Sequence, residues 1–309
     1  MSAKASISPS DTGRGAVGYP LRAISFGTPA VNIERRADGT IYLRPKTPLG
    51  DYPVRITDRL HHWASAEPNR VFMAERNEGG GWREITYAEL LVSSRHIASA
   101  LLARGLSADR PVVILSGNSI DHALLAFGAL YAGVAFCPVS PAYSLISKDY
   151  GKLGYVMDLL TPGLVFADDA DKFAGALLAN VPEDTEIVAS FGALPARRMT
   201  MLADLMATPI DPRVDAAHAA IGPDTIAKFL LTSGSTGNPK AVINTQRMIC
   251  ANQVMIRETM SFLKDEPPVI VDWLPWNHTF GGNHNIGLTL FNGGSMYLDE
   301  GKPMPGGIE

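Results

Sequence analysis

Residues 230–242 read Leu-Leu-Thr-Ser-Gly-Ser-Thr-Gly-Asn-Pro-Lys-Ala-Val, with two glycines, four hydroxyl side chains and one lysine between two short apolar runs. Glycine lets backbone N–H groups converge on an anion, the hydroxyls add donors, and the Lys240 ammonium offsets negative charge. Pro239 helps to fix the exit from the loop. The stretch therefore predicts a phosphate-binding loop.

Two other structures are compatible with part of this pattern. A Walker A loop needs Gly immediately before its Lys and Ser or Thr immediately after it, whereas Pro239 and Ala241 occupy those places. A glycine- and serine-rich surface turn stays open for the Gly-Ser-Thr-Gly core taken alone. The short apolar runs at 226–231 and 241–243 favour a loop that joins two strands.

The composition is that of a globular protein with enough apolar residues to bury a core. The chain has 309 residues, of which 46% are hydrophobic and 19% charged, and this length predicts about two domains. A net charge of -4 without Lys/Arg runs argues against nucleic acid as the main partner. Cys137 and Cys250 have no metal-type spacing, which favours a reducing compartment, and the first 20 residues lack the apolar core of a secretory signal. We therefore expect a cytoplasmic protein.

Beyond residue 51, strand and helix signals alternate in the rhythm of an α/β protein. Thr86-Tyr87-Ala88-Glu89 predicts a capping box that opens a helix ending at Gly105. The apolar segment 123–139 is interrupted by glycines and a proline, and we expect a helix and a buried strand there and no membrane span. Further strands are predicted at 111–116, 134–139, 164–166, 186–189, 226–231, 241–243, 269–274 and 295–298. Further helices are predicted at 120–131, at 170–178, after Thr200 and from Thr245 to about Phe262.

The domain organisation follows from two changes along the chain. Residues 1–50 are predicted to be a tail and a polar lead-in, because they are punctuated by proline and have no clear period. The run 208–223 is predicted to be a boundary or linker for the same reason. This division gives a first α/β subdomain at 51–222 and the start of a second at 223–309.

A second motif, at residues 272–282, reads Asp-Trp-Leu-Pro-Trp-Asn-His-Thr-Phe-Gly-Gly. It follows a predicted strand, at the edge where α/β sheets bind ligands, and its aromatic residues predict a pocket wall. The aromatics could instead fill the core, with His278 a structural histidine. A zinc site with His278 and His284 fits no familiar spacing, so no metal ligand is assigned.

Both motifs resemble signatures of the adenylate-forming superfamily. The pattern Thr-Ser-Gly-Ser-Thr-Gly-x-Pro-Lys at 232–240 resembles its phosphate loop, and Leu-Pro-x-x-His at 274–278 resembles its next signature, which lines the acyl site. Together with these motifs, the segments 52–60, 72–76 and 85–87, Trp63, Trp82 and Gly117-Asn118-Ser119 resemble feruloyl-CoA synthases most.

The resemblance implies an N-terminal domain of two α/β/α layered parts, truncated before the rest of the second subdomain and the C-terminal domain. It implies a ligase that uses ATP and Mg²⁺ to activate a carboxylic acid, such as the hydroxycinnamate ferulate, and transfers the acyl group to coenzyme A. The ATP phosphates would be held by Thr232, Ser233, Gly234, Ser235, Thr236, Gly237 and Lys240. The acid would meet Trp276, Asn277, His278, Phe280, Gly281 and Gly282. Lys240, Thr236 and His278 would act in catalysis.

The family's later signatures, which contact nucleotide and metal and close the site, do not occur before residue 309. The resemblance therefore implies that this chain alone is inactive or nearly so. Two further interpretations stay open. One is a non-catalytic nucleotide-binding module, and the other is a ligase for a medium-chain fatty acid or another aryl acid.

Overall fold

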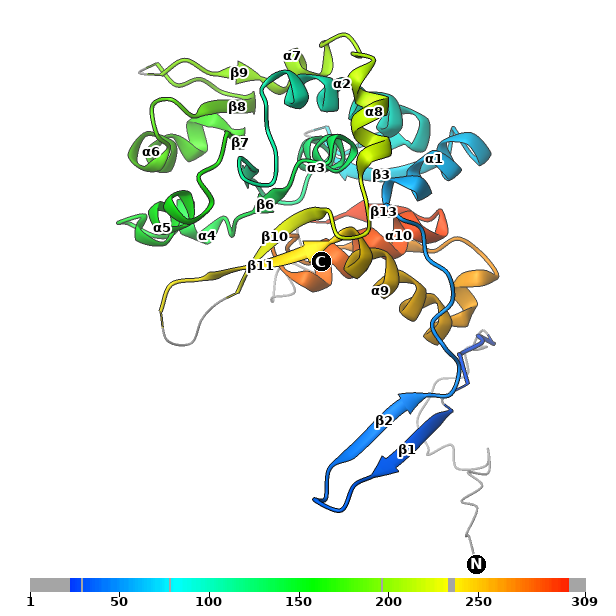
Figure 1. Ribbon diagram of the computed structural model, residues 1–309. Helices are drawn as coiled ribbons and strands as arrows, with labels where there is room; N and C mark the ends of the chain where they lie inside the picture. The colour runs from blue at the N-terminus through cyan, green and yellow to red at the C-terminus, as the bar shows by residue number, and fades with distance from the viewer. Residues whose placement is uncertain (1–22, 29, 78, 196, 233–236, 300–309) are drawn as a thin grey trace, which may run out of the picture.

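The computed structural model describes residues 23–28, 30–77, 79–195, 197–232 and 237–299. Two sheets with their helices form the body, and a small two-stranded hairpin stands away from it (Figure 1). The alternation of strands and helices predicted for an α/β protein is confirmed.

The larger sheet has seven strands in the order β11-β10-β6-β5-β7-β8-β9, and every neighbouring pair except β10–β11 is parallel. Successive side chains of β5 pack alternately in two hydrophobic cores, one on each face of the sheet. Val112 and Ile114 pack in one, and Val113 and Leu115 in the other. A sheet buried on both faces needs such an apolar run and not an alternation of apolar and polar residues. The strands are β5 (Val112–Leu115), β6 (Phe136–Pro138), β7 (Leu164–Asp169), β8 (Glu186–Phe191), β9 (Thr200–Met201), β10 (Ile226–Thr232) and β11 (Lys240–Thr245).

Helices cover both faces of this sheet, so the predicted α/β/α layering is confirmed. One face carries α4 (Ala142–Leu145), α5 (Gly151–Leu160) and α6 (Ala170–Asn180). The other carries α2 (Tyr87–Ala103), α3 (Ile120–Ala132), α7 (Leu202–Met206) and α8 (Arg213–Ala220), with α1 (Thr57–Ala66) packed on the same core.

The second sheet has the order β12-β13-β3-β4 and shares that core through residues such as Met73 and Met296. Its strands are β3 (Val71–Arg76), β4 (Trp82–Thr86), β12 (Val269–Asp272) and β13 (Ser295–Leu298). Near it lie α9 (Gln246–Thr259), the 3₁₀ helix η1 (Ser261–Lys264), the π-helix η2 (Phe280–Asn285) and α10 (Ile286–Asn292). Both sheets take strands from either side of residue 222. The predicted division at 222/223 therefore does not coincide with a boundary between sheets and stays a prediction about segments of the chain.

Local signals in the sequence explain where the main helices begin. The Thr86 hydroxyl accepts a hydrogen bond from the Glu89 N–H while the Glu89 carboxylate accepts one from the Thr86 N–H, so the capping box is confirmed. Thr245 caps α9, which ends at Thr259 and not near Phe262 because the chain tightens into η1. The apolar segment 123–139 forms most of α3 and then β6. In the part of the chain that the structure describes, no helix has both the length and the apolar character needed to cross a bilayer.

Two segments for which the sequence predicted no helix or strand contain regular elements. The run 208–223 contains the helix α8, which begins after Pro212 and buries Val214 and His218. Only these two side chains face the core, which is too few to produce a visible period. The lead-in contains a hairpin, β1 (Val31–Arg35) and β2 (Ile41–Pro45), that turns at Gly39 with a φ of 86°.

Candidate functional site

The predicted phosphate loop connects the last two strands at one end of the seven-stranded sheet. β10 and β11 are antiparallel, and the cross-strand partners nearest the connection are Thr232 and Lys240. Ser233, Gly234, Ser235 and Thr236 lie outside the described residues. The Lys240 side chain is exposed, and its ammonium has no hydrogen bond or ion pair within the described ranges. A Cβ added at Gly237 would meet open space, and the Thr232 hydroxyl donates to the Lys240 carbonyl at 3.4 Å.

The second motif is organised by a buried carboxylate at the end of β12. Asp272 is 1% exposed and accepts hydrogen bonds from Trp276 Nε1 (3.2 Å), Asn285 Nδ2 (2.7 Å) and the Leu274 N–H (3.2 Å). These three donors come from the following turn and from η2. Asp272 therefore fixes the path of the whole segment, as buried polar groups do when their partners are satisfied.

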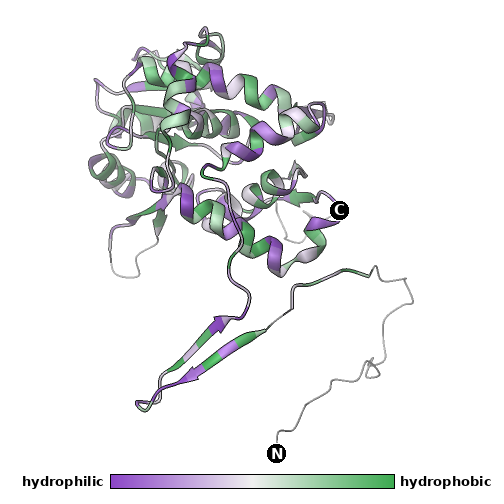
Figure 2. Cartoon of the chain, turned by 45° about the vertical axis from the view of Figure 1, so that its right-hand side comes forward, coloured by the Kyte–Doolittle hydropathy of each residue, from purple (hydrophilic) through white to green (hydrophobic). Residues whose placement is uncertain are grey.

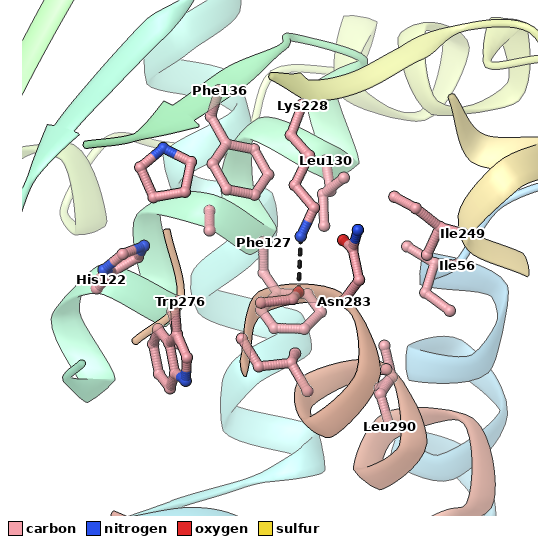
Figure 3. A pocket seen from close by; sticks show the side chains of 16 residues that line it. Ile56, His122, Phe127, Leu130, Phe136, Lys228, Ile249, Trp276, Asn283 and Leu290 are labelled. Atoms are coloured by element: carbon pink, nitrogen blue, oxygen red, sulfur yellow. Dashed lines mark hydrogen bonds between the residues drawn. The ribbon is translucent and has the colours of Figure 1, made fainter. Parts of the chain in front are cut away.

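Trp276 points into the interior and not into a cleft. It is 2% exposed, and its ring meets His122 edge-on at 5.0 Å. Both line an apolar cavity between α3 and η2 (Figure 3). Burial lowers the pKa of His122 to about 4, so its imidazole is neutral at physiological pH. The structure thus separates Trp276 from His278, whereas the motif predicted one shared wall.

His278 and Asn277 line a different cleft, of about 290 Å³, together with Trp273, Pro275 and Asp299. Its other lining residues follow β5 (116–118) and β6 (140–141). The Asn118 amide holds the backbone at 274–276 in place. Its Nδ2 donates to the Leu274 carbonyl at 2.9 Å, and its Oδ1 accepts from the Trp276 N–H at 3.1 Å.

The remaining residues of the motif occupy two further positions. Phe280 is 55% exposed and stacks on His284, with ring centroids 4.7 Å apart. Gly281 and Gly282 lie in η2 against the preceding turn. An added Cβ would come within 2.5 Å of the Leu274 carbonyl oxygen at Gly281 and 2.2 Å of the Trp276 carbonyl oxygen at Gly282. Only glycine fits at these two positions, because the backbone of the preceding turn, 274–276, lies against them.

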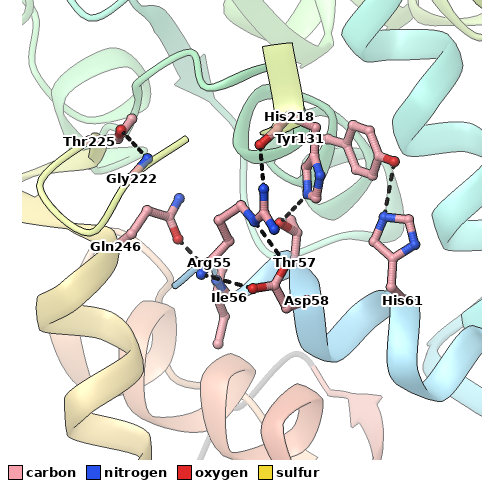
Figure 4. Close-up of polar contacts among 10 residues, drawn as sticks. All are labelled: Arg55, Ile56, Thr57, Asp58, His61, Tyr131, His218, Gly222, Thr225 and Gln246. Atoms are coloured by element: carbon pink, nitrogen blue, oxygen red, sulfur yellow. Dashed lines mark hydrogen bonds and ion pairs between the residues drawn. The ribbon is translucent and has the colours of Figure 1, made fainter. Parts of the chain in front are cut away.

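A second group of histidines lies between α1, α3 and α8 (Figure 4). Thr57 Oγ1 is 2.9 Å from His218 Nε2, His61 Nε2 is 3.0 Å from the Tyr131 hydroxyl, and the Tyr131 ring stacks on His218 at 4.2 Å. Burial lowers the pKa of His218 to about 4. These contacts fasten α8 to the body, and we interpret the group as structural. Among the residues described, no group of three or more His, Cys, Asp or Glu could hold a metal ion.

Four residues without a role predicted from the sequence hold the two motifs in place. Asp272 and Asn118 do so through the bonds described above, Lys228 by a hydrogen bond to the Gly282 carbonyl, and Asn244 by one from Asn283. Asp272 could have been found, since a polar residue at the end of an apolar strand is a common signal at ligand-binding edges. The hydrogen-bond partners of Lys228 and Asn244 come from a distant segment of the chain, and no local pattern in the sequence predicts these contacts.

Comparison with known proteins gives the family. A profile of the family described as AMP-binding enzyme matches residues 60–306. The indigoidine synthase of Streptomyces lavendulae is 30% identical over 208 residues, which are 67% of this chain and 14% of that protein. The long-chain-fatty-acid–AMP ligase FadD32 of Mycolicibacterium smegmatis is 27% identical over 241 residues, covering 73% of this chain and 34% of that one.

Solved structures agree on the fold. Apo MatB from Rhodopseudomonas palustris superposes with a TM-score of 0.60 at 25% identity, covering 79% of this chain and 44% of that one. The chain thus spans less than half the length of each of these three proteins. The match of the family profile over most of the chain, together with these likenesses, shows that the chain belongs to the AMP-binding enzyme family.

Proposed function

We propose that the protein carrying this chain is an ATP-dependent acid–thiol ligase. In the first step a carboxylate oxygen bonds to the α-phosphorus of ATP and the bond to pyrophosphate breaks. In the second, the thiol of coenzyme A displaces AMP from the acyl carbon. A carboxylate is a poor electrophile, so the activation supplies the leaving group that the thioester step needs.

The observation that carries this proposal is the loop sequence at 232–240 between two paired strands, with Lys240 exposed and its ammonium unpaired within the described ranges. Pyrophosphate departs with developing negative charge, and a mobile cation beside it stabilises the transition state. We assign this role to Lys240. The hydroxyls of Thr232, Ser233, Ser235 and Thr236 and the N–H groups of the loop, including Gly234 and Gly237, would hold the β- and γ-phosphates.

We place the acid in the cleft of His278 and Asn277. Its indole wall is Trp273, since Trp276 is buried on the other side of the segment. A flat aromatic acid suits such a wall, and the resemblance to feruloyl-CoA synthases points to a hydroxycinnamate such as ferulate. Phe280, Gly281 and Gly282 would shape the segment that carries His278.

Mg²⁺ bound with ATP usually takes one or two protein carboxylates beside the phosphates and water, and we assign no such carboxylate among the described residues. The ion would be held mainly by the ATP phosphates and would offset their negative charge. No residue is assigned to coenzyme A. We also propose that the 309 residues alone do not complete the reaction.

The test is acid-dependent exchange of pyrophosphate into ATP, measured on the protein expressed from its full reading frame with ferulate, caffeate, benzoate and octanoate. We expect exchange with the two hydroxycinnamates above that with benzoate and octanoate. Activity with octanoate alone would remove the aromatic acid from the proposal. Nucleotide binding without exchange for any acid would favour a non-catalytic binding module.

The matched variant is Lys240→Ala in the same protein. Loss of one charge-stabilising donor lowers the rate by about 10²–10³-fold, which is about 3 kcal/mol. An exchange rate equal to that of the wild type would exclude the charge-following role of Lys240.

A further inference from the structure

Lys228 is a buried amine in an apolar cavity. It lies on β10 and is 6% exposed, and the cavity beside it, of about 40 Å³, is lined by side chains such as Phe127, Leu130 and Phe136 (Figure 3). His122 is the other titratable side chain lining the cavity. Burial lowers the pKa of Lys228 to about 7. Burying an amine without a carboxylate partner costs free energy, so an interaction of this lysine must offset that cost.

Among the described residues the amine has one hydrogen-bond acceptor, and its Nζ also lies 5.6 Å from the centroid of the Phe136 ring. Lys228 Nζ donates to the Gly282 carbonyl at 2.6 Å. Gly282 lies in η2, and its own N–H donates to the His278 carbonyl at 2.8 Å. The lysine therefore connects the strand that leads into the phosphate loop to the segment that carries His278.

A second hydrogen bond connects the strand that leaves the loop to the next residue of η2. Asn283 Nδ2 donates to Asn244 Oδ1 on β11 at 2.9 Å, and also to Thr279 Oγ1 at 3.1 Å. Asn283 Oδ1 is buried without a hydrogen-bond partner, and Asn283 lines the same cavity as Lys228. Both strands of the loop hairpin are thus bonded to consecutive residues of one helical turn.

That turn needs external support. It follows a π-helical path, in which the hydrogen-bond geometry is less regular than in an α-helix, and it contains Gly281 and Gly282, whose backbones are the least restrained of any residue. Without side-chain contacts from the hairpin, η2 would be held by Asp272, by Gln253 of α9, whose Nε2 donates to the Asn283 carbonyl at 2.9 Å, and by packing.

We propose that Lys228 and Asn244 are positioning residues, which fasten η2 to the two strands that flank the phosphate loop and thereby fix the acid site relative to the ATP site. This inference rests on the proposed function. The two reactants must meet in line, and a misplacement of about 1 Å can lower the rate by about 10²-fold. A bond from each strand restrains the turn at two points and so limits rotation as well as translation.

The test uses Lys228→Met, Asn244→Ala and the double variant in the protein expressed from its full reading frame. Leu130→Met is the matched control, because it changes the same cavity without removing a donor and conserves volume. Three quantities are measured: kcat and KM for the acid in pyrophosphate exchange, and the Kd for ATP without acid. We expect Lys228→Met to lower kcat/KM for the acid by about 10–100-fold, with the Kd for ATP unchanged. Asn244→Ala should act in the same direction, and Lys228→Gln, which keeps an N–H donor, should retain more activity than Lys228→Met.

A variant that is only less stable would have a smaller active fraction and an unchanged KM for the acid. Thermal unfolding of each variant distinguishes this loss of folded protein from a misplaced acid site. The inference is overturned if Lys228→Met behaves like Leu130→Met, or if acid turnover and ATP affinity fall by the same factor. If Lys228→Met does not fold, the same criteria apply to Lys228→Gln and Asn244→Ala. A wild-type protein inactive with every acid contradicts the proposed function instead.

Discussion

Two of the antiparallel hairpins, β1–β2 and β10–β11, are of similar length and differ in what surrounds them. In β1–β2 nearly every residue is exposed, including Ile33 at 57% and Leu43 at 64%, and the hairpin stands away from the body (Figure 2). In β10–β11 the first strand is hydrogen-bonded to β6, and its residues Ala227, Lys228 and Leu230 are buried. The proposed chemistry is assigned to the second hairpin.

The contacts that hold each hairpin explain the difference. β1–β2 depends on its own ladder and on exposed contacts, such as the Glu34–Arg44 ion pair at 3.4 Å and Arg36 over the Tyr42 ring at 4.1 Å. Exposed pairs of this kind contribute about 0–1 kcal/mol each, and an isolated two-stranded hairpin is marginal in water. β10–β11 gains burial and two hydrogen bonds to η2. The residues of the proposed chemistry therefore belong to the hairpin whose position is set by tertiary contacts and not by its own strand pairing.

The largest effect that tests this comparison is expected from Leu230→Ala on β10. Leu230 is 7% exposed, and removing its side chain leaves a cavity beside the sheet. We expect the free energy of unfolding to fall by about 2–5 kcal/mol. Denaturant unfolding measures it. A loss no greater than that of an exposed leucine would show that β10 is not anchored by burial.

A smaller effect concerns the pH dependence of the anchor. Burial lowers the pKa of Lys228 from 10.5 to about 7, so between these values the unfolded chain keeps the proton and the folded chain releases it. The penalty for burying the charge is full below about pH 7 and is relieved as the pH rises. The wild type should therefore gain stability relative to Lys228→Met between about pH 7 and 10, with a slope of up to about 1.4 kcal/mol per pH unit. Both proteins share every other titrating group. A stability difference that stays constant from pH 7 to 9 would show that Lys228 does not titrate in this range.

The sequence was sufficient for features that depend on neighbours along the chain. The capping box at Thr86 and Glu89 and the cap at Thr245 mark the starts of α2 and α9, because their partners lie within three residues. The buried strand at 112–115 is recognisable because a parallel strand covered on both faces is uniformly apolar. The two motifs, 232–240 and 272–282, likewise pointed to the family that the comparisons show.

What the sequence could not predict depends on contacts between distant segments. An indole beside His278 is equally compatible with a cleft wall or a core position, and the choice for Trp276 is set by Asp272 and His122 together. A lysine in a strand suggests a solvent-facing side chain, whereas the Lys228 side chain is buried and donates to the Gly282 carbonyl. That acceptor lies 54 residues further along the chain, so the local sequence gives no sign of it. The β1–β2 hairpin was missed although Val31 and Ile33, and Ile41 and Leu43, alternate with more polar residues, because the alternation spans only a few residues in a polar segment and its apolar side chains meet no core.

The smallest effect is expected from the same chemical change in the other hairpin, Leu43→Ala. Leu43 is 64% exposed on β2, and its cross-strand partner Ile33 is also exposed, so little apolar surface leaves water when the hairpin forms. We expect the global free energy of unfolding to change by no more than about 0.5 kcal/mol, as for other surface substitutions. The measurement is the same denaturant unfolding as for Leu230→Ala, so both leucines are compared on one scale. A loss at Leu43 as large as that at Leu230 would mean that something covers the apolar face of β1–β2 in solution, and the contrast between a free and an anchored hairpin would then be wrong.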